Sequence, residues 1–214
     1  MTPEKRKSRT ETLLKQEGIP FLPSLPCIES EAETHLRSPE EVGIRIACLF
    51  CVVGYAFEPG DMACKEYLRE YKLWDHLTSD ELSFLSNDSL DPKSIINFTW
   101  RSEAMFVLMW ATCLFDVLPM PREETDNSLI VSKFPSFDQS PWLFIKELRL
   151  RDKSIILDAS DLIYRLHWSV RQAEMENKQP PADLDPGLIQ EWHHAINWIT
   201  RYEDQEWDEV NTDT

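Results

Sequence analysis

The segment that decides the fold reads WRSEAMFVLMWA and spans residues 100–111. Arg101 and Glu103 stand near its start, and every residue from position 104 to position 111 is apolar. A second segment, IACLFCVVGYAF at 46–57, carries no charge at all. Both segments are shorter than the roughly 20 residues that a helix needs to span a bilayer. We therefore expect two helices that are buried in the core of a globular protein.

Helix signals surround these two segments. Ser38 to Glu41 reads as a capping box with proline at the first helical position, which predicts a helix that runs to about Phe57. A helix cap at Asn97 or Thr99 is expected to open the segment quoted above. Apolar residues at spacings of three and four predict further helices at 3–17, 62–76, 78–85, 141–148, 153–177 and 186–199.

These elements predict an all-α protein that forms one compact domain over 1–214, with about seven or eight helices around the two buried central ones. Residues 119–139 read as an irregular loop, in which Leu129 to Val131 is at most one short β element. The ends, 1–8 and 203–214, are expected to be mobile except where Trp207 docks.

The charge of the chain restricts its partners. There are 38 acidic and 22 basic residues in 214, which gives a formal net charge of -16. Such a surface repels phosphate backbones and anionic membranes and favours basic partners, so we expect no nucleic acid and no membrane as a partner. The five cysteines are an odd number in apolar surroundings, and no secretory segment is recognisable near the start, which favours a reduced, cytoplasmic setting.

Metal and redox motifs are weak. Cys48 and Cys51 have the spacing of a metal or redox pair, but they lie in an apolar helix without a second pair, so we interpret them as core residues. His193 and His194 are adjacent and point about 100° apart on a helix, so they cannot chelate one ion together. We expect no metal and no cofactor.

Arg101 and Glu103 are the candidates for chemistry. Residues two positions apart do not face each other on a helix, so each needs a partner elsewhere. Arg45 is the lone charge in the apolar part of the other buried helix, residues 44–57, and we predict a structural ion pair between Arg45 and Glu103. The alternative is a pocket in which Glu103 acts as a general base and Arg101 holds an anionic substrate.

The chain has eight tryptophans. Most fall on apolar helix faces, whereas Trp168 and Trp207 have polar neighbours. These two are therefore candidate anchors for a protein partner.

Short motifs are spread along the whole chain: Arg9 with Gly18-Ile19-Pro20, Leu25-Pro26 with Ile28-Glu29-Ser30, Leu36 to Glu41, Trp100 to Ala104 with Trp110, Ala195 to Trp198, and Trp207 to Val210 with Thr212 to Thr214. Their order and spacing resemble the bacterial domain-of-unknown-function family numbered four-two-seven-two. The resemblance implies a single-domain, cytoplasmic bacterial protein without an established reaction. It also implies that residues 207–214 are a docked part of the domain.

Three functions remain open at this point. The first is a non-enzymatic, acidic protein-binding protein, comparable to an immunity protein or an antitoxin, because complementary charge speeds the encounter with a basic partner. The second is a small-molecule enzyme or ligand-binding domain with its pocket at Arg101 and Glu103. The third is a helical scaffold or self-associating module.

Overall fold

The computed structural model describes residues 1–87 and 89–214. Within these ranges the chain is entirely helical and contains no β-strand, which confirms the all-α class. The α-helices are α1 (Pro3–Gln16), α2 (Pro39–Phe57), α3 (Ala63–Glu70), α4 (Ser79–Ser86), α5 (Pro92–Ala111), α6 (Asn127–Lys133), α7 (Pro141–Glu147), α8 (Lys153–Met175) and α9 (Pro186–Ile199). Short 3-10 turns at Trp74–His76, Pro181–Asp183, Tyr202–Asp204 and Trp207–Glu209 complete the described elements.

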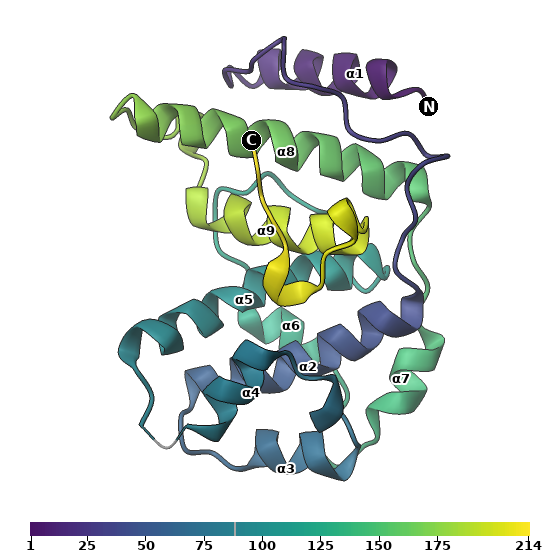
Figure 1. Cartoon of the computed structure of the whole chain (residues 1–214), viewed down its shortest axis with the longest axis vertical. Coiled ribbons are helices and arrows are strands. Elements are labelled where there is room, and N and C mark those ends of the chain that lie inside the picture. The colour runs from purple at the N-terminus through teal and green to yellow at the C-terminus, as the bar shows by residue number, and fades with distance from the viewer. Residues whose placement is uncertain (88) are drawn as a thin grey trace.

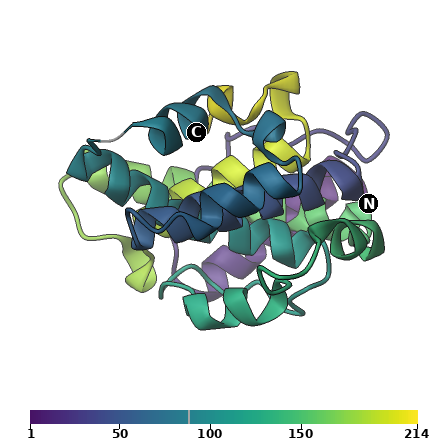
Figure 2. The ribbon, with the colours of Figure 1, turned by 90° about the horizontal axis from the view of Figure 1, so that it is seen from below.

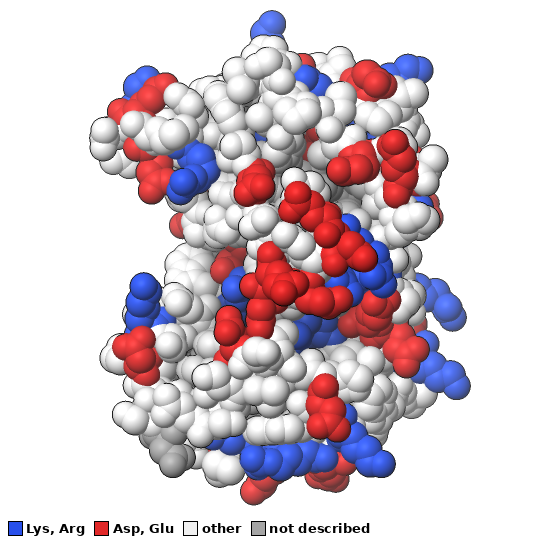
Figure 3. Space-filling view, in the orientation of Figure 1, with Lys and Arg blue, Asp and Glu red and all other residues white. Residues whose placement is uncertain are grey.

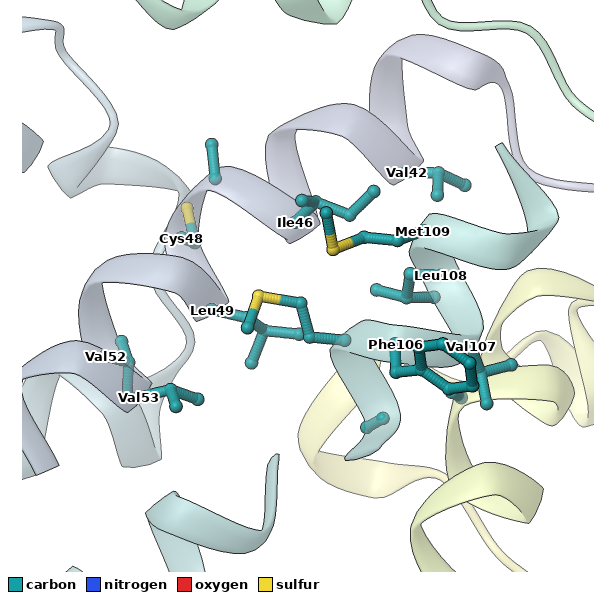
Figure 4. Packing of buried hydrophobic residues seen from close by; sticks show 14 of the residues in the cluster. Val42, Ile46, Cys48, Leu49, Val52, Val53, Phe106, Val107, Leu108 and Met109 are labelled. Carbon is teal, nitrogen blue, oxygen red and sulfur yellow. The ribbon is translucent and has the colours of Figure 1, made fainter. Parts of the chain in front are cut away.

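Helices α2 and α5 form the centre of the core, as the two apolar segments predict. Both are buried almost all round over their apolar stretches. Figure 4 shows Ile46 and Leu49 of α2 facing Leu108 and Met109 of α5, and all four side chains are fully buried. Removal of this apolar surface from water is the main source of stability.

The longest helices are stacked in series. Helix α1 packs on α8, α8 on α9, α9 on α5, and α5 on α2 (Figure 1). Helices α3 and α7 pack on the remaining sides of α2. Residues 202–214 form what we call the C-terminal segment. Figure 2 shows α4 and this segment on one side of α2, with α6 and α7 on the opposite side. Residues 205–207 therefore lie beside α2, which belongs to the first third of the chain.

Three elements differ from the sequence prediction. The helix predicted at 62–76 is interrupted, because α3 ends at Glu70 and Lys72 has a positive φ of 58° before the turn at Trp74–His76. Helix α5 starts at Pro92 with Asp91 as its cap, rather than at Asn97 or Thr99. Asp91-Pro92 is itself a helix-start signal in the sequence, and the helix that it opens continues through Asn97 and Thr99 without a second cap. The predicted β element around Leu129 is wrong, because these residues belong to α6, whose first turn is capped by the Asp126 side chain.

Both ends of the chain pack against the domain. Arg6 of α1 is fully buried and forms ion pairs with Asp158 at 2.9 Å and with Glu31 at 3.0 Å. Trp207 is buried near the other end. The docked C-terminus that the family resemblance implies is therefore present in the structure. Among the helices of the described residues, none is both long and apolar enough to cross a membrane.

The crossing of α2 and α7 depends on a glycine. A Cβ atom at Gly43 would lie 2.9 Å from Cδ1 of Leu148 and 3.0 Å from Cγ2 of Ile145. We expect Gly43→Ala to lower the free energy of unfolding by about 1–2 kcal/mol, because overpacking outweighs the better helix propensity of alanine. Urea denaturation measures this change.

Gly54→Ala in the same helix is the matched control. A Cβ atom there would meet a single flexible group, the Sγ of Cys64 at 3.1 Å. We expect this substitution to be neutral or stabilising by up to about 1 kcal/mol. Equal effects of the two substitutions would show that α7 does not restrict position 43.

Candidate functional site

Arg101 and Glu103 do not share a pocket in the structure. Arg101 donates to Oε2 of Glu191 on α9 at 2.9 Å and borders a surface hollow. Glu103 is only 2% exposed and accepts hydrogen bonds from Thr125 N (2.7 Å), Thr125 Oγ1 (2.9 Å) and Trp192 Nε1 (3.2 Å). Its carboxylate therefore holds the loop after α5 against α9. The expectation that each charge finds a partner elsewhere is confirmed, but a cavity touched by both is not observed among the described residues.

The predicted Arg45–Glu103 ion pair is wrong. Arg45 instead donates from one guanidinium nitrogen to both carboxylate oxygens of Glu81, at 2.8 and 2.6 Å, and both side chains are buried. The same carboxylate accepts the backbone N–H of Thr78 and thereby completes the capping box of α4. Glu81 therefore joins α4 to α2. Glu103 does not pair with Arg45 and instead accepts the hydrogen bonds from Thr125 and Trp192.

Trp207 does not serve as an exposed anchor, because it is 4% exposed in the folded chain. Its ring lies edge-on to Trp198 at 5.3 Å and to His194 at 4.6 Å, and the Arg45 guanidinium lies 5.3 Å from its centroid. Trp207 thus fixes the C-terminal segment to α2 and α9. Trp168 is half-buried on α8, and its role as a partner anchor stays a prediction.

Arg37 reinforces this attachment. Its side chain donates to the carbonyl oxygen of Trp198 at 3.1 Å and to that of Gln205 at 2.8 Å. Its guanidinium also lies 4.4 Å from the centroid of the Trp198 ring. Since Arg37 is itself buried, these contacts place the backbone of the C-terminal segment firmly against the start of α2.

The attached segment presents a row of carboxylates to solvent. We call it the acidic ridge, and its exposed members are Glu203, Asp204, Glu206, Asp208 and Glu209. Figure 3 shows acidic side chains gathered over the middle of this face, where the C-terminal segment runs. No lysine or arginine interrupts positions 203–210.

A hollow of about 310 Å³ lies beside the ridge, between α4, α5 and Trp207. Asp80, Asp91 and Asp208 line it together with Arg101. Asp208 accepts the backbone N–H of Asp80 at 3.1 Å, which also places its negative charge at the N-terminus of α4. In the part of the chain that the structure describes, none of these three aspartates forms an ion pair, whereas Arg101 is already neutralised by Glu191. The hollow is therefore a place where negative charge is in excess.

Two histidines meet on the other side of α9. His167 of α8 and His193 of α9 lie with their Nδ1 atoms 2.7 Å apart, and their rings are perpendicular. The pKa of His167 is lowered to about 4, mainly by burial, and that of His193 to about 3 by burial and, to a smaller extent, by the neighbouring imidazoles of His167 and His194. Both rings are consequently neutral near pH 7, with one acting as hydrogen-bond donor and the other as acceptor.

The thiols and carboxylates do not assemble into a metal centre in the described ranges, where no group of three or more possible ligands comes together. Cys48 lies fully buried in α2, and burial raises the pKa of its thiol to about 12. A thiol with so high a pKa is a poor nucleophile.

Sequence reasoning missed Glu81, Glu191 and the histidine pair. Glu81 was identified only as a helix cap, and its second role depends on where α4 lies. His167 and His193 are 26 positions apart, so only the packing of α8 on α9 brings them together. Their apolar helical neighbours are the one signal in the sequence that both rings point inward.

Comparison with known proteins gives one match. The model of a family described as "Domain of unknown function (DUF4272)" matches residues 6–210. No curated protein matches the chain. No solved structure matches it either.

Proposed function

Since the chain belongs to DUF4272, a family described only as a domain of unknown function, we propose that it is a binding protein for a basic protein segment. The observation that carries this proposal is the acidic ridge with its adjoining hollow. Five exposed carboxylates stand within seven consecutive residues, 203–209. The buried contacts of Trp207 and Arg37 hold this segment in place, so binding requires little reordering of the backbone.

The hollow suits a lysine or arginine side chain. Asp80, Asp91 and Asp208 supply acceptor oxygens on three different segments of the chain, and 310 Å³ accommodates a side chain of that length. A cation that enters the hollow gains charge-assisted hydrogen bonds without displacing an existing ion pair. The neighbouring ridge then attracts further basic residues of the same partner.

The net charge of -16 supports the same partner chemistry over longer distances. A strongly negative protein attracts a basic partner before contact, which raises the association rate at low salt and makes it depend on ionic strength. A basic toxin is one partner of this kind, and the protein would then act as an immunity protein or an antitoxin in the cytoplasm.

The test compares two double variants with the same change in charge. Glu203→Lys with Glu209→Lys alters the ridge. Among the described residues the ion pairs of the ridge involve Asp204 and Glu206, and neither Glu203 nor Glu209 forms one. Glu124→Lys with Glu147→Lys alters exposed positions before α6 and at the end of α7. We expect a stoichiometric partner to copurify with the tagged protein and with the control variant at low salt, and the ridge variant to capture about tenfold less of it.

The partner identified in this way is then measured by calorimetry at about 0.05 M and about 0.5 M salt, where we expect affinity to fall as salt rises. Equal capture by both variants would place the binding surface elsewhere. The absence of any stoichiometric partner from native cells at low salt would refute the proposal.

A further inference from the structure

One member of the histidine pair, His193, borders a second hollow. This hollow measures about 360 Å³ and lies between α8, α9, residues 26–29 and the C-terminal segment. Polar groups from all four line it, among them Glu29, Ser160, Tyr164, His193, Tyr202 and Asp213. His193 is the most deeply buried imidazole of the chain, at 2% exposed, and it faces this space.

The neighbours of His193 favour one tautomer of the histidine pair. Nε2 of Gln190 donates to Oγ1 of Thr212 at 2.7 Å, and Gln190 borders the same surface hollow as His167. Because Nδ1 of His167 is turned toward His193, its Nε2 is the atom that can donate a proton to Oε1 of Gln190. A neutral imidazole carries one proton, so Nδ1 of His167 is the acceptor in that tautomer.

In that tautomer His193 donates its Nδ1 proton to His167, and its Nε2 carries a lone pair. The pair then presents an unprotonated nitrogen at the wall of the hollow. Since the pKa of His193 is about 3, this nitrogen stays an acceptor at ordinary pH and does not become a cation.

The remaining lining favours a ligand that is a donor and carries positive charge. Glu29 and Asp213 bring carboxylates to the hollow, and both raise the pKa of Tyr202 through their negative charge, after the larger effects of burial and Glu203. The ring of Tyr164 lies 6.0 Å from that of His193 and offers an aromatic face. Arg165 is close by but is paired with Asp161 at 2.9 Å, so it does not neutralise these carboxylates.

We propose that the histidine pair adopts this tautomer and that the hollow binds a small molecule with an ammonium group, which donates a hydrogen bond to Nε2 of His193 while His167 acts as the positioning residue. The carboxylates of Glu29 and Asp213 balance the charge of the ammonium group, and the tyrosine rings contact its apolar part. This site is separate from the acidic ridge and does not depend on the binding of a basic protein.

The experiment uses 2-phenylethylamine as the probe, with 3-phenylpropionate and 2-phenylethanol as its anionic and neutral counterparts. Nitrogen NMR of protein labelled at histidine first reports the tautomers, and we expect Nε2 of His193 to be unprotonated and Nε2 of His167 to be protonated. On titration with the amine, the Nε2 resonance of His193 should shift and saturate, while the carboxylate probe should leave it unchanged.

Two variants complete the test. His193→Gln should weaken amine binding about tenfold or more through the lost acceptor. His194→Gln is the matched control, because His194 is also buried on the same helix but does not border this hollow. This variant should bind the amine as the unmodified protein does. His167→Gln should leave a mixture of His193 tautomers, which a merely structural role of His167 would not produce.

The wild-type NMR titration keeps the proposal testable even if a variant fails to fold. An unshifted Nε2 resonance of His193 under saturating amine would overturn the proposal. Equal binding of the amine and the carboxylate would overturn it as well, as would a protonated Nε2 of His193 in the free protein.

Discussion

Acidification from pH 7 to pH 5 is expected to lower the free energy of unfolding by about 5 kcal/mol through three histidines alone. His167, His193 and His194 are each at most 6% exposed. Burial lowers the pKa of His167 to about 4 and that of each of the other two to about 3. In the unfolded chain, the three imidazoles titrate near 6.5.

The sign follows from where protons bind. Below about pH 6.5 the unfolded chain takes up a proton at each imidazole, whereas the folded protein keeps all three neutral down to about pH 4. Protons therefore favour the unfolded state throughout this interval. The stability is complete above the unfolded pKa and declines by up to about 4 kcal/mol per pH unit as the pH falls toward the folded values.

Urea denaturation at pH 7, 6 and 5 measures this dependence, with His194→Gln as the comparison. Removal of one imidazole should reduce the slope by about one third over this range. Glu191 acts in the opposite direction, because burial raises its pKa, so the folded protein binds that proton first. A slope that is unchanged in His194→Gln would show that His194 is protonated in the folded state.

Glu81→Gln is expected to lower the free energy of unfolding by about 3–5 kcal/mol, because it leaves the Arg45 guanidinium buried without a counter-charge. The amide oxygen of glutamine can still accept the N–H of Thr78, so the helix cap of α4 is kept and the charge alone changes. Thermal and urea unfolding both measure the loss.

The double variant Arg45→Met with Glu81→Gln separates lost packing from unpaired charge. Since methionine at position 45 removes the buried cation, we expect the double variant to recover more than half of the stability that Glu81→Gln loses. Glu174→Gln is the exposed control, because its pair with Arg171 at 2.8 Å is open to solvent and should contribute about 1 kcal/mol or less. If the double variant recovers none of this stability, the unpaired charge of Arg45 is not the cause of the loss in Glu81→Gln.

The sequence predicts those parts of the fold whose causes are local. The capping boxes at Ser38 and Thr78 and the glycine at position 18, which ends α1 with φ +69°, are signals within a few residues of the structure they produce. Helix α6 was misassigned because Leu129 to Val131 are three consecutive apolar residues. Only the cap from Asp126 and the burial of Ile130 favour a helix there.

The candidate sites were less predictable because they depend on how helices are placed. A buried arginine in α2 requires a carboxylate partner, and the sequence correctly predicts that Arg45 has one. Both Glu81 and Glu103 could meet it, and the choice depends on α4 lying over α2. The acidity of the C-terminal segment is visible in the sequence, but the direction of Trp207 is not, since the same residue could face solvent or the core.

The burial of Trp207 has a consequence for biosynthesis. The ribosome completes α2 about 150 residues before it reaches this tryptophan, so Arg37 and Arg45 gain their contacts with Gln205 and Trp207 only after those residues have been made. Until then the surfaces beneath residues 205–207 are exposed to water. The acidic ridge therefore takes its shape in the same step in which Arg37 and Trp207 make these contacts.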